Sequence, residues 1–219
     1  MRLVLLGAPG VGKGVQGYLI SKEYDIPKIS TGDILRQEIS ENTRLGRKAI
    51  NFIEKGELVP DEVINKIVEA RLKKDDCKKG FLLDGYPRTI PQAEFLLNFL
   101  SDEGLKLDAV LNIKLDDSTI TNRLSNRRIC SKCGKDFNLA VNPPPEDGIC
   151  PVCGGKIYQR EDDRIEVIEE RLKVYRSNTK PLVDFFREKG KLFEVDGNGS
   201  ISEVHKNFVS IINKIKDDI

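Results

Sequence analysis

Four glycines and a lysine directly follow a short apolar run near the N-terminus. Residues 7–14 read Gly-Ala-Pro-Gly-Val-Gly-Lys-Gly after Leu3-Val4-Leu5-Leu6. Glycines at this spacing let the backbone turn tightly and direct successive N–H groups at phosphate oxygens, while Lys13 supplies a positive charge. A glycine-rich strand-to-helix turn without a ligand is the alternative. The Gly-x4-Gly-Lys spacing between a strand and a helix favours a nucleotide as the ligand.

Four of the five cysteines form two Cys-x2-Cys pairs. Cys130 and Cys133 are separated by 16 residues from Cys150 and Cys153, which is the spacing of a tetrahedral zinc site. Four thiolates leave no open coordination position, so such a zinc ion is structural and replaces the core that about 30 residues cannot bury. Two disulfides are the alternative. Cys77 is expected to be a small, partly buried apolar residue.

The elements that must position these residues alternate along the chain. We expect short strands at residues 3–6, 26–29, 81–85, 109–115 and 192–195, with helical patterns between them, one at 13–24 and one beginning at Asp61. Thr31 is a candidate helix cap. This alternation predicts an α/β fold with a parallel sheet flanked by helices, whose ligands bind at the carboxyl ends of the strands. Cysteines, glycines and prolines interrupt the pattern at 128–159, which indicates a separate small insert.

The charge balance excludes some classes of partner. The 219 residues include 36 basic and 35 acidic side chains, a formal net charge of +1, so no global field attracts nucleic acid or an anionic membrane. No apolar run reaches the roughly 18 residues that span a bilayer, and no cleavable signal precedes the first strand. We therefore expect a cytoplasmic protein. Without a heptad pattern, the expected state is a monomer.

The glycine loop and several later motifs together resemble the adenylate kinases over essentially the whole chain. These motifs are Ser30-Thr31-Gly32-Asp33, Arg36, Asp84-Gly85-Tyr86-Pro87-Arg88, Gln92 and Arg160-Glu161-Asp162-Asp163. The four-cysteine insert resembles the zinc-bearing lid of the long form of this family. The resemblance implies a P-loop nucleoside monophosphate kinase with a five-stranded parallel sheet that transfers the terminal phosphoryl group of MgATP to AMP, giving two ADP. It also implies a core at 1–29, 60–121 and 161–219, an AMP-binding segment at 30–59 and a lid at 122–160.

The same resemblance assigns residues to three roles. The catalytic residues would be Lys13, Asp84, Arg88, Arg123, Arg160 and Arg171. ATP would contact Gly10, Val11, Gly12, Lys13, Gly14, Val15, Arg123, Arg127, Asp136, Phe137 and Gly199. AMP would contact Thr31, Arg36, Glu57, Leu58, Val59, Gly85, Tyr86, Pro87, Arg88, Gln92, Arg160 and Arg171.

The chemistry of the reaction explains these residue types. The acceptor is a phosphate oxygen that is already anionic, so positioning and charge neutralisation replace a general base, and arginines separate the phosphates of two nucleotides. Asp84, at the end of an apolar strand, can order water around Mg²⁺, and Asp33 is a second candidate. Asp162 and Asp163 either orient Arg160 or cap a helix whose apolar stripe is Ile165, Ile168, Leu172 and Tyr175.

Some assignments have alternatives. Gln92 either reads adenine or lies on a helix surface, Tyr86 is a base contact or a core aromatic, and Phe137 packs on adenine or in the lid. A kinase for another nucleoside monophosphate would use the same loop and arginines. A zinc-ribbon protein that binds nucleic acid with the help of ATP is disfavoured, because its basic patch would be short and aromatic residues make up only 6% of the chain.

One position departs from the family pattern. Members usually carry threonine after Lys-Gly, whereas this chain has Val15, so the hydroxyl that typically faces Mg²⁺ is missing. We expect the metal to be held through phosphate oxygens and through waters ordered by Asp84, with some loss of turnover. The segments at 30–59 and 122–160 are expected to close over the substrates.

Overall fold

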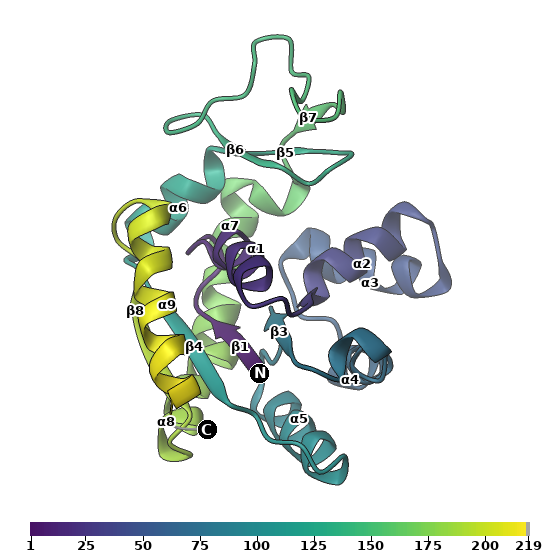
Figure 1. Ribbon diagram of the computed structural model, residues 1–219. Helices are drawn as coiled ribbons and strands as arrows, with labels where there is room; N and C mark the ends of the chain where they lie inside the picture. The colour runs from purple at the N-terminus through teal and green to yellow at the C-terminus, as the bar shows by residue number, and fades with distance from the viewer. Residues whose placement is uncertain (218–219) are drawn as a thin grey trace.

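A five-stranded parallel sheet forms the centre of the protein in the computed structural model, which describes residues 1–217 (Figure 1). The strand order is β2-β3-β1-β4-β8. Leu3, Leu5 and Leu82 face one side of the sheet, and Val4, Leu6 and Leu83 face the other. All six are almost completely buried, as expected for a parallel sheet covered on both faces. The strands are β1 (Arg2–Leu6), β2 (Lys28–Ser30), β3 (Phe81–Asp84), β4 (Ala109–Lys114) and β8 (Leu192–Asp196).

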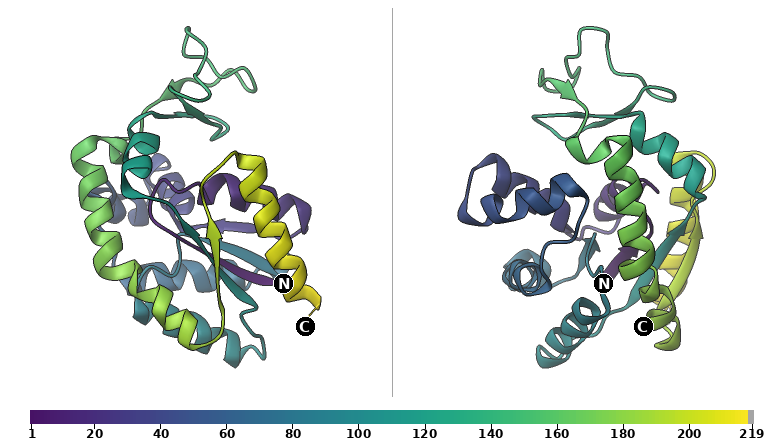
Figure 2. Two further views of the ribbon diagram at one scale, coloured as in Figure 1. Left: turned by 90° about the vertical axis from the view of Figure 1, so that its left-hand side faces the viewer. Right: turned by 180° about the vertical axis from the view of Figure 1, so that it is seen from behind.

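Helices cover both faces of this sheet (Figure 2). One face packs against α4 (Asp61–Leu72), α5 (Ile90–Asp102) and α8 (Pro181–Glu188). The other face packs against α1 (Lys13–Glu23), α6 (Asp117–Ser125), α7 (Ile165–Val174) and α9 (Ile201–Asp217). Two 3-10 helices, η1 (Asp75–Cys77) and η2 (Glu161–Asp163), precede β3 and α7, and a π-helical segment, η3 (Tyr175–Thr179), joins α7 to α8. Among residues 1–217, no helix is both long and apolar enough to cross a bilayer.

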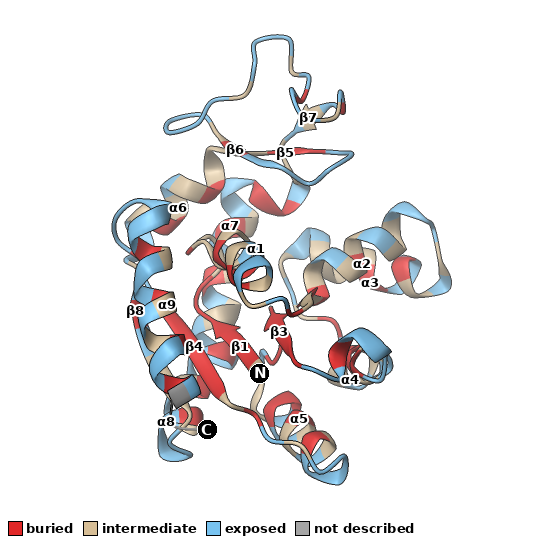
Figure 3. Ribbon diagram, viewed as in Figure 1, coloured by how far each residue is buried: buried red, intermediate tan, exposed pale blue. Residues whose placement is uncertain are grey.

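Two parts of the chain project from this core. A pair of packed helices, α2 (Thr31–Ser40) and α3 (Arg44–Lys55), follows β2. A three-stranded antiparallel sheet of order β6-β5-β7 lies above the carboxyl ends of the core strands (Figure 1). Most of this small sheet and its loops are exposed, in contrast to the core strands (Figure 3). Its strands are β5 (Arg127–Cys130), β6 (Asp136–Asn138) and β7 (Ile157–Tyr158).

The expected α/β class, the parallel five-stranded sheet and the flanking helices are confirmed. Two local predictions were wrong. The cap of α2 is Ser30, whose hydroxyl accepts a hydrogen bond from the Asp33 N–H at 3.2 Å, whereas Thr31 is the first helical residue. Ile165 is 54% exposed because it lies at the first turn of α7, so the buried part of the stripe begins at Ile168.

Candidate functional site

The glycine loop connects β1 to α1 at the carboxyl end of the sheet. Gly10 and Gly12 have φ values of 85° and 104°, in the left-handed region that favours glycine. A Cβ atom on Gly10 would lie 2.7 Å from Leu124 Cγ, so the loop also needs glycine for close packing. Gly12 is the N-cap of α1, and the first N–H groups of the helix are therefore left for a ligand.

Lys13 is held by the loop itself. Its Nζ donates to the Gly7 carbonyl at 2.7 Å and to the Ala8 carbonyl at 2.8 Å. Removal from water lowers the pKa of Lys13 to about 7, and the negative charge of Asp84 opposes this shift. A polyphosphate at the loop would offer the ammonium group a charged partner, so this geometry suits an anionic ligand.

Arginines from four separate elements converge near this loop. Arg36 lies on α2, Arg88 follows β3, Arg160 follows β7, and Arg171 lies on α7. Burial, together with the nearby charges of Arg36 and Arg127, lowers the pKa of Arg160 to about 10. Its buried Nε atom has no hydrogen-bond partner within residues 1–217. Cations this close repel one another, and an anion placed between them would relieve that repulsion.

Two buried aspartates fix the orientation of Arg171 and of a further arginine, Arg127 on β5. Asp163 is fully buried, and its carboxylate accepts hydrogen bonds from Arg127 Nε at 2.8 Å, Arg127 Nη2 at 2.6 Å and Arg171 Nη1 at 3.1 Å. Asp162 lies 3.3 Å from Arg171 Nη1. The sequence-based expectation was that these aspartates orient Arg160 or cap α7. The capping part was wrong, because the N-cap of α7 is Arg164 and no side chain caps it. The ion pairs of the two carboxylates are with Arg127 and Arg171, and Asp162 acts on Arg160 through its charge alone.

The remaining ATP-side candidates surround the loop. Arg123 Nη1 reaches the Val11 carbonyl at 3.5 Å. Gly199, with φ of 103°, lies just before α9, and the Ile201 carbonyl of that helix accepts a hydrogen bond from Gln16 Nε2 of α1 at 2.9 Å. Val15 is half-buried on the first turn of α1, and Gly14 beside it is exposed. The structure therefore brings these residues to one side of the sheet.

Most of the residues expected to contact AMP come from α2, from the loop after α3 and from the segment after β3. The Thr31 hydroxyl donates to the Gly85 carbonyl at 2.8 Å, and Arg88 Nε donates to the same carbonyl at 2.9 Å. The loop after α3, which contains Glu57, Leu58 and Val59, begins at Gly56, where a Cβ atom would lie 2.8 Å from Arg171 Cγ. Pro87 follows Tyr86 through a cis peptide bond.

Gln92 and Tyr86 are both engaged inside the protein. Gln92 is 2% exposed, its Oε1 accepts from the Arg88 N–H at 2.7 Å, and its Nε2 donates to Asp61 Oδ1 at 2.7 Å. The buried Tyr86 hydroxyl donates to Asn65 Oδ1 at 2.7 Å, and burial raises the pKa of this tyrosine. In this structure the Gln92 amide therefore positions the Arg88 backbone, and Tyr86 packs as a core aromatic.

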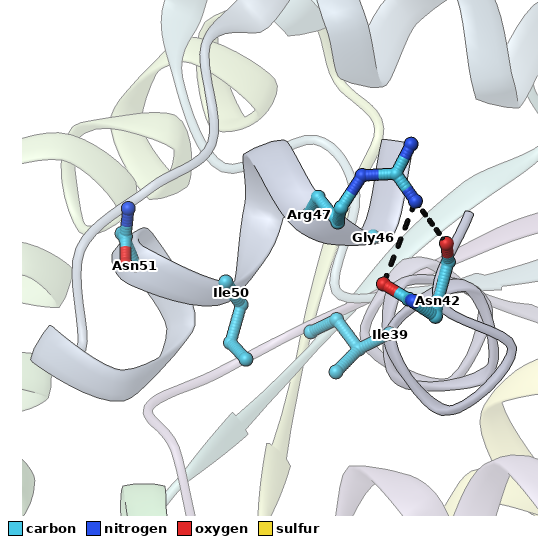
Figure 4. A pocket seen from close by; sticks show the side chains of 6 residues that line it. All are labelled: Ile39, Asn42, Gly46, Arg47, Ile50 and Asn51. Carbon is cyan, nitrogen blue, oxygen red and sulfur yellow. Dashed lines mark hydrogen bonds between the residues drawn. The ribbon is translucent and has the colours of Figure 1, made fainter. Parts of the chain in front are cut away.

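A hollow between α2 and α3 lies within the helix pair (Figure 4). It has a volume of about 300 Å³ and is lined by Ile39, Asn42, Gly46, Arg47, Ile50 and Asn51. Arg47 donates to the Asn42 backbone carbonyl and also reaches its side-chain oxygen. A Cβ atom on Gly46 would lie 2.1 Å from the Glu38 carbonyl, so the two helices touch closely beside this hollow.

The four cysteines meet at one end of the small sheet. Their Sγ atoms all lie within 4.8 Å of one another, with 3.4 Å between Cys130 and Cys153 and 3.7 Å between Cys133 and Cys150. A tetrahedral zinc site with metal–sulfur bonds of about 2.3 Å has sulfur–sulfur edges of about 3.8 Å. The cysteines therefore fit a zinc ion. Phe137 is 5% exposed and packs against Cys130 and Cys150, whereas Asp136 is exposed on the same strand.

Two residues of the site were missed by the sequence analysis. Lys28 on β2 forms an ion pair with Asp84 at 3.3 Å, and Asp61 binds Gln92 Nε2 as well as the Thr89 hydroxyl at 2.8 Å. The pairing of β2 with β3 brings Lys28 to Asp84, and this pairing is a long-range contact that spacing does not reveal. In the sequence, Asp61 looks like any acidic residue in the first turn of a helix, so nothing there signals its contacts with Gln92 and Thr89.

Comparisons with known proteins identify the family. The adenylate kinase family model matches residues 5–191. An adenylate kinase of Caldanaerobacter subterraneus subsp. tengcongensis is 51% identical over 220 aligned residues, which cover 100% of both chains. One from Archaeoglobus fulgidus is 48% identical, covering 99% of this chain and 100% of its own. One from Listeria innocua is 51% identical, covering 97% and 99%.

The chain belongs to the adenylate kinase family. Its reaction is the reversible transfer of the terminal phosphoryl group of ATP to AMP, which gives two ADP. The substrates of an adenylate kinase are thus ATP, AMP and ADP. The convergence of cations on the glycine loop is the arrangement that such an enzyme needs, because two polyphosphates must approach each other.

Proposed function

We propose that phosphoryl transfer takes place at the carboxyl end of the sheet, between the α2–α3 pair and the four-cysteine sheet. The observation that supports this location is the convergence of Lys13 with arginines from four elements, whose charges act on one another. Six side chains would act on the reacting phosphates. They are Lys13, Asp84, Arg88, Arg123, Arg160 and Arg171.

ATP would bind with its phosphates on the glycine loop. The N–H groups at the start of α1 and Lys13 would bind the phosphate oxygens, with Arg123 and Arg127 beside them. Asp84 and Asp33 lie at the same end of the sheet, and carboxylates are ligands that suit Mg²⁺ or its bound waters. These two residues would hold the metal, which when bound neutralises charge on the phosphates. Phe137 is buried in the lid core, so the exposed Asp136 and the backbone are the available ATP contacts there.

AMP would bind between α2, the loop after α3 and the segment after β3. Arg36, Arg88 and Arg171 would contact its phosphate, and Thr31, Gly85 and Gln92 would contact or position its base. The attacking group is an anionic phosphate oxygen, so the side chains need only hold it in line and neutralise the developing charge. Asp163 fixes Arg127 and Arg171 before the substrates arrive, which lowers the reorganisation needed during the reaction.

Three parts of the chain would have different roles in the reaction. Residues 1–29, 60–121 and 161–217 would form the core, whose predicted last two residues, 218 and 219, lie outside the described part of the chain. Residues 30–59 would form the AMP-binding segment, and 122–160 a lid held by structural zinc on Cys130, Cys133, Cys150 and Cys153. We further propose that the protein is a cytoplasmic monomer. We propose that it acts without a nucleic-acid or membrane partner, because a net charge of +1 creates no overall field that attracts either.

The acceptor specificity can be tested by ³¹P NMR. Purified protein is mixed with MgATP and, in turn, with AMP, CMP, UMP or GMP, and the formation of each diphosphate is followed. We expect rapid transfer to AMP and slow transfer to the others. Activity mainly with another acceptor would contradict the AMP assignment and place the base-reading contacts elsewhere than Gln92.

A pair of arginine variants tests the proposed location of the phosphoryl-transfer site. Arg88→Ala should lower turnover about 100-fold or more, because it removes a cation that contacts the transferred group. Arg187→Ala is the matched control, since Arg187 lies on the surface of α8, half exposed and paired with Asp184 and Glu194. Equal turnover in the two variants would contradict the proposed site.

A further inference from the structure

Lys28 places a positive charge beside the carboxylates of Asp84 and Asp33. Its Nζ lies 3.3 Å from Asp84 Oδ2 and 3.9 Å from Asp33 Oδ2. The Lys28 side chain is 20% exposed and that of Asp84 is 11% exposed, so water only partly screens this pair. The ammonium group therefore neutralises carboxylates that, under the proposed function, face the metal bound to ATP.

The fold makes room for the stem of this lysine. The stem crosses α1 at Gly17, where a Cβ atom would lie 3.2 Å from Lys28 Cε and 3.3 Å from Lys28 Cδ. Gly17 is buried inside a helix, a position where glycine costs roughly 1 kcal/mol relative to alanine. The missing side chain lets Lys28 pass close to the helix axis, and a Cβ atom on Gly14 would lie 4.0 Å from Nζ. Lys28 is thus seated between the glycine loop and Asp84.

The ammonium group of Lys28 has two opposite effects in this position. It reduces the repulsion between the carboxylates and the phosphates of a nucleotide that carries no metal. It also competes with a divalent cation for the same carboxylate, because Lys28 Nζ occupies Asp84 Oδ2 and its positive charge repels a metal ion beside Asp84. Val15 also lacks the hydroxyl that threonine would offer to the metal from the glycine loop. Lys28 and Val15 would therefore both weaken metal binding by this chain.

We propose that Lys28 competes with Mg²⁺ for Asp84 and so reduces the preference of the enzyme for magnesium-bound over metal-free nucleotide. Lys28 is a positioning residue in this scheme, because it acts through Asp84. The inference rests on the proposed function, since it takes Asp84 as the carboxylate that faces the metal.

The test compares nucleotide binding with and without metal. Lys28→Met removes the charge and keeps an unbranched stem to pack across Gly17, and Lys28→Arg keeps the charge. Lys22→Gln, at an exposed position later in α1, controls for the change in net charge. Calorimetry measures the Kd of a non-hydrolysable ATP analogue in excess Mg²⁺ and in EDTA. In a second readout, the EPR signal of free Mn²⁺ reports how tightly each protein holds the metal with ADP, and circular dichroism checks folding.

We expect Lys28→Met to change the Kd values of the metal-free and the magnesium-bound nucleotide in opposite directions. Lys28→Met should weaken binding of the metal-free nucleotide and tighten binding of the magnesium complex, so that the ratio of the two Kd values rises about fivefold or more. It should also lower the concentration of Mn²⁺ needed for half-saturation. Lys28→Arg and Lys22→Gln should leave the ratio within about twofold of the wild-type value.

Two results would overturn the inference while leaving the proposed function intact. If Lys28→Met weakens both complexes equally, Lys28 binds phosphate directly. If it changes neither Kd, the lysine is only structural. Phosphoryl transfer from ATP to AMP is assayed alongside, and its absence in the wild-type protein would instead overturn the proposed function.

Discussion

Charge at the glycine loop is set by a few side chains whose surroundings differ. Lys13 is bound by two carbonyls of its own loop, and loss of water contact lowers its pKa to about 7. Lys28 forms ion pairs with the carboxylates of Asp84 and Asp33. Lys13 is therefore the cation that gains most from an arriving phosphate, whereas Lys28 already has its partners.

The first prediction concerns Val15. Val15→Thr should raise turnover several-fold and lower the Mg²⁺ concentration needed for half-maximal activity, because a hydroxyl at this position of the loop can join the shell of the metal. Steady-state rates over a series of free Mg²⁺ concentrations measure both effects. Val15→Ala is the control, because it changes the volume of the side chain without adding a hydroxyl. If Val15→Thr changes neither turnover nor the Mg²⁺ dependence, the missing hydroxyl has no catalytic consequence.

The second prediction concerns Asp163. Asp163→Asn should lower the free energy of unfolding by about 3 kcal/mol, because two largely buried arginines lose the fully buried carboxylate that balances their charge. Turnover should fall too, since Arg127 and Arg171 lose their fixed orientation. Urea unfolding followed by circular dichroism measures the stability.

The matched control for Asp163→Asn is Glu161→Gln. Glu161 pairs with Arg164, and both side chains are more than 60% exposed, so this change should cost less than about 1 kcal/mol. Equal stability losses in the two variants would show that burial of the Asp163 network contributes nothing.

At the scale of elements, the sequence predicted what depends on local pattern. The strands at 81–84 and 109–114 and the helix from Asp61 were predicted to within about one residue, because apolar runs and capping residues mark them. The glycine loop was predicted with its turn into α1. Such features are set by backbone geometry within a few residues.

The interactions across elements were not predicted. Asp162 and Asp163 bind Arg127 and Arg171 rather than Arg160, and the partners of Gln92 come from α4 and from the segment after β3. These contacts depend on how β5, η2 and α7 pack, and spacing along the chain does not determine that packing. The roles of the individual site residues toward substrates remain predictions.

The third prediction concerns the four-cysteine sheet. Cys130, Phe137 and Cys150 form its buried apolar cluster, which is too small to hold three strands. Removal of zinc with a strong chelator should therefore unfold this sheet at a lower temperature than the core, by an amount consistent with the roughly 10 kcal/mol or more that structural zinc contributes in small modules. Hydrogen exchange resolved by segment, together with thermal melting, measures the order of unfolding.

A pair of cysteine variants provides the control for zinc removal. Cys133→Ser should reproduce the effect of the chelator, whereas Cys77→Ser should not, because Cys77 lies in η1 with its sulfur near Arg71. Near-equal melting of the zinc-loaded and metal-free proteins would contradict a structural role for the metal.

At the scale of the whole molecule, two projecting parts flank the site from different sides. The α2–α3 pair and the four-cysteine sheet both extend from the core near the carboxyl ends of the strands (Figures 1 and 2). Each is attached close to residues of the site: α2 follows β2 directly, and η2 after β7 carries the aspartates that bind Arg127 and Arg171. A movement of either part would therefore move the cations that bind phosphate.

The fourth prediction follows from this arrangement. If closure of both parts excludes water during transfer, the substrates cannot leave until the parts reopen, and opening should limit turnover. A rapid-quench experiment with enzyme in excess of ATP measures the transfer step alone, and steady-state assays measure turnover. The single-turnover rate should exceed kcat by about tenfold or more, and a viscous solvent should slow kcat more than the transfer step. Equal rates would mean that chemistry, rather than the movement of the α2–α3 pair and the four-cysteine sheet, limits the enzyme.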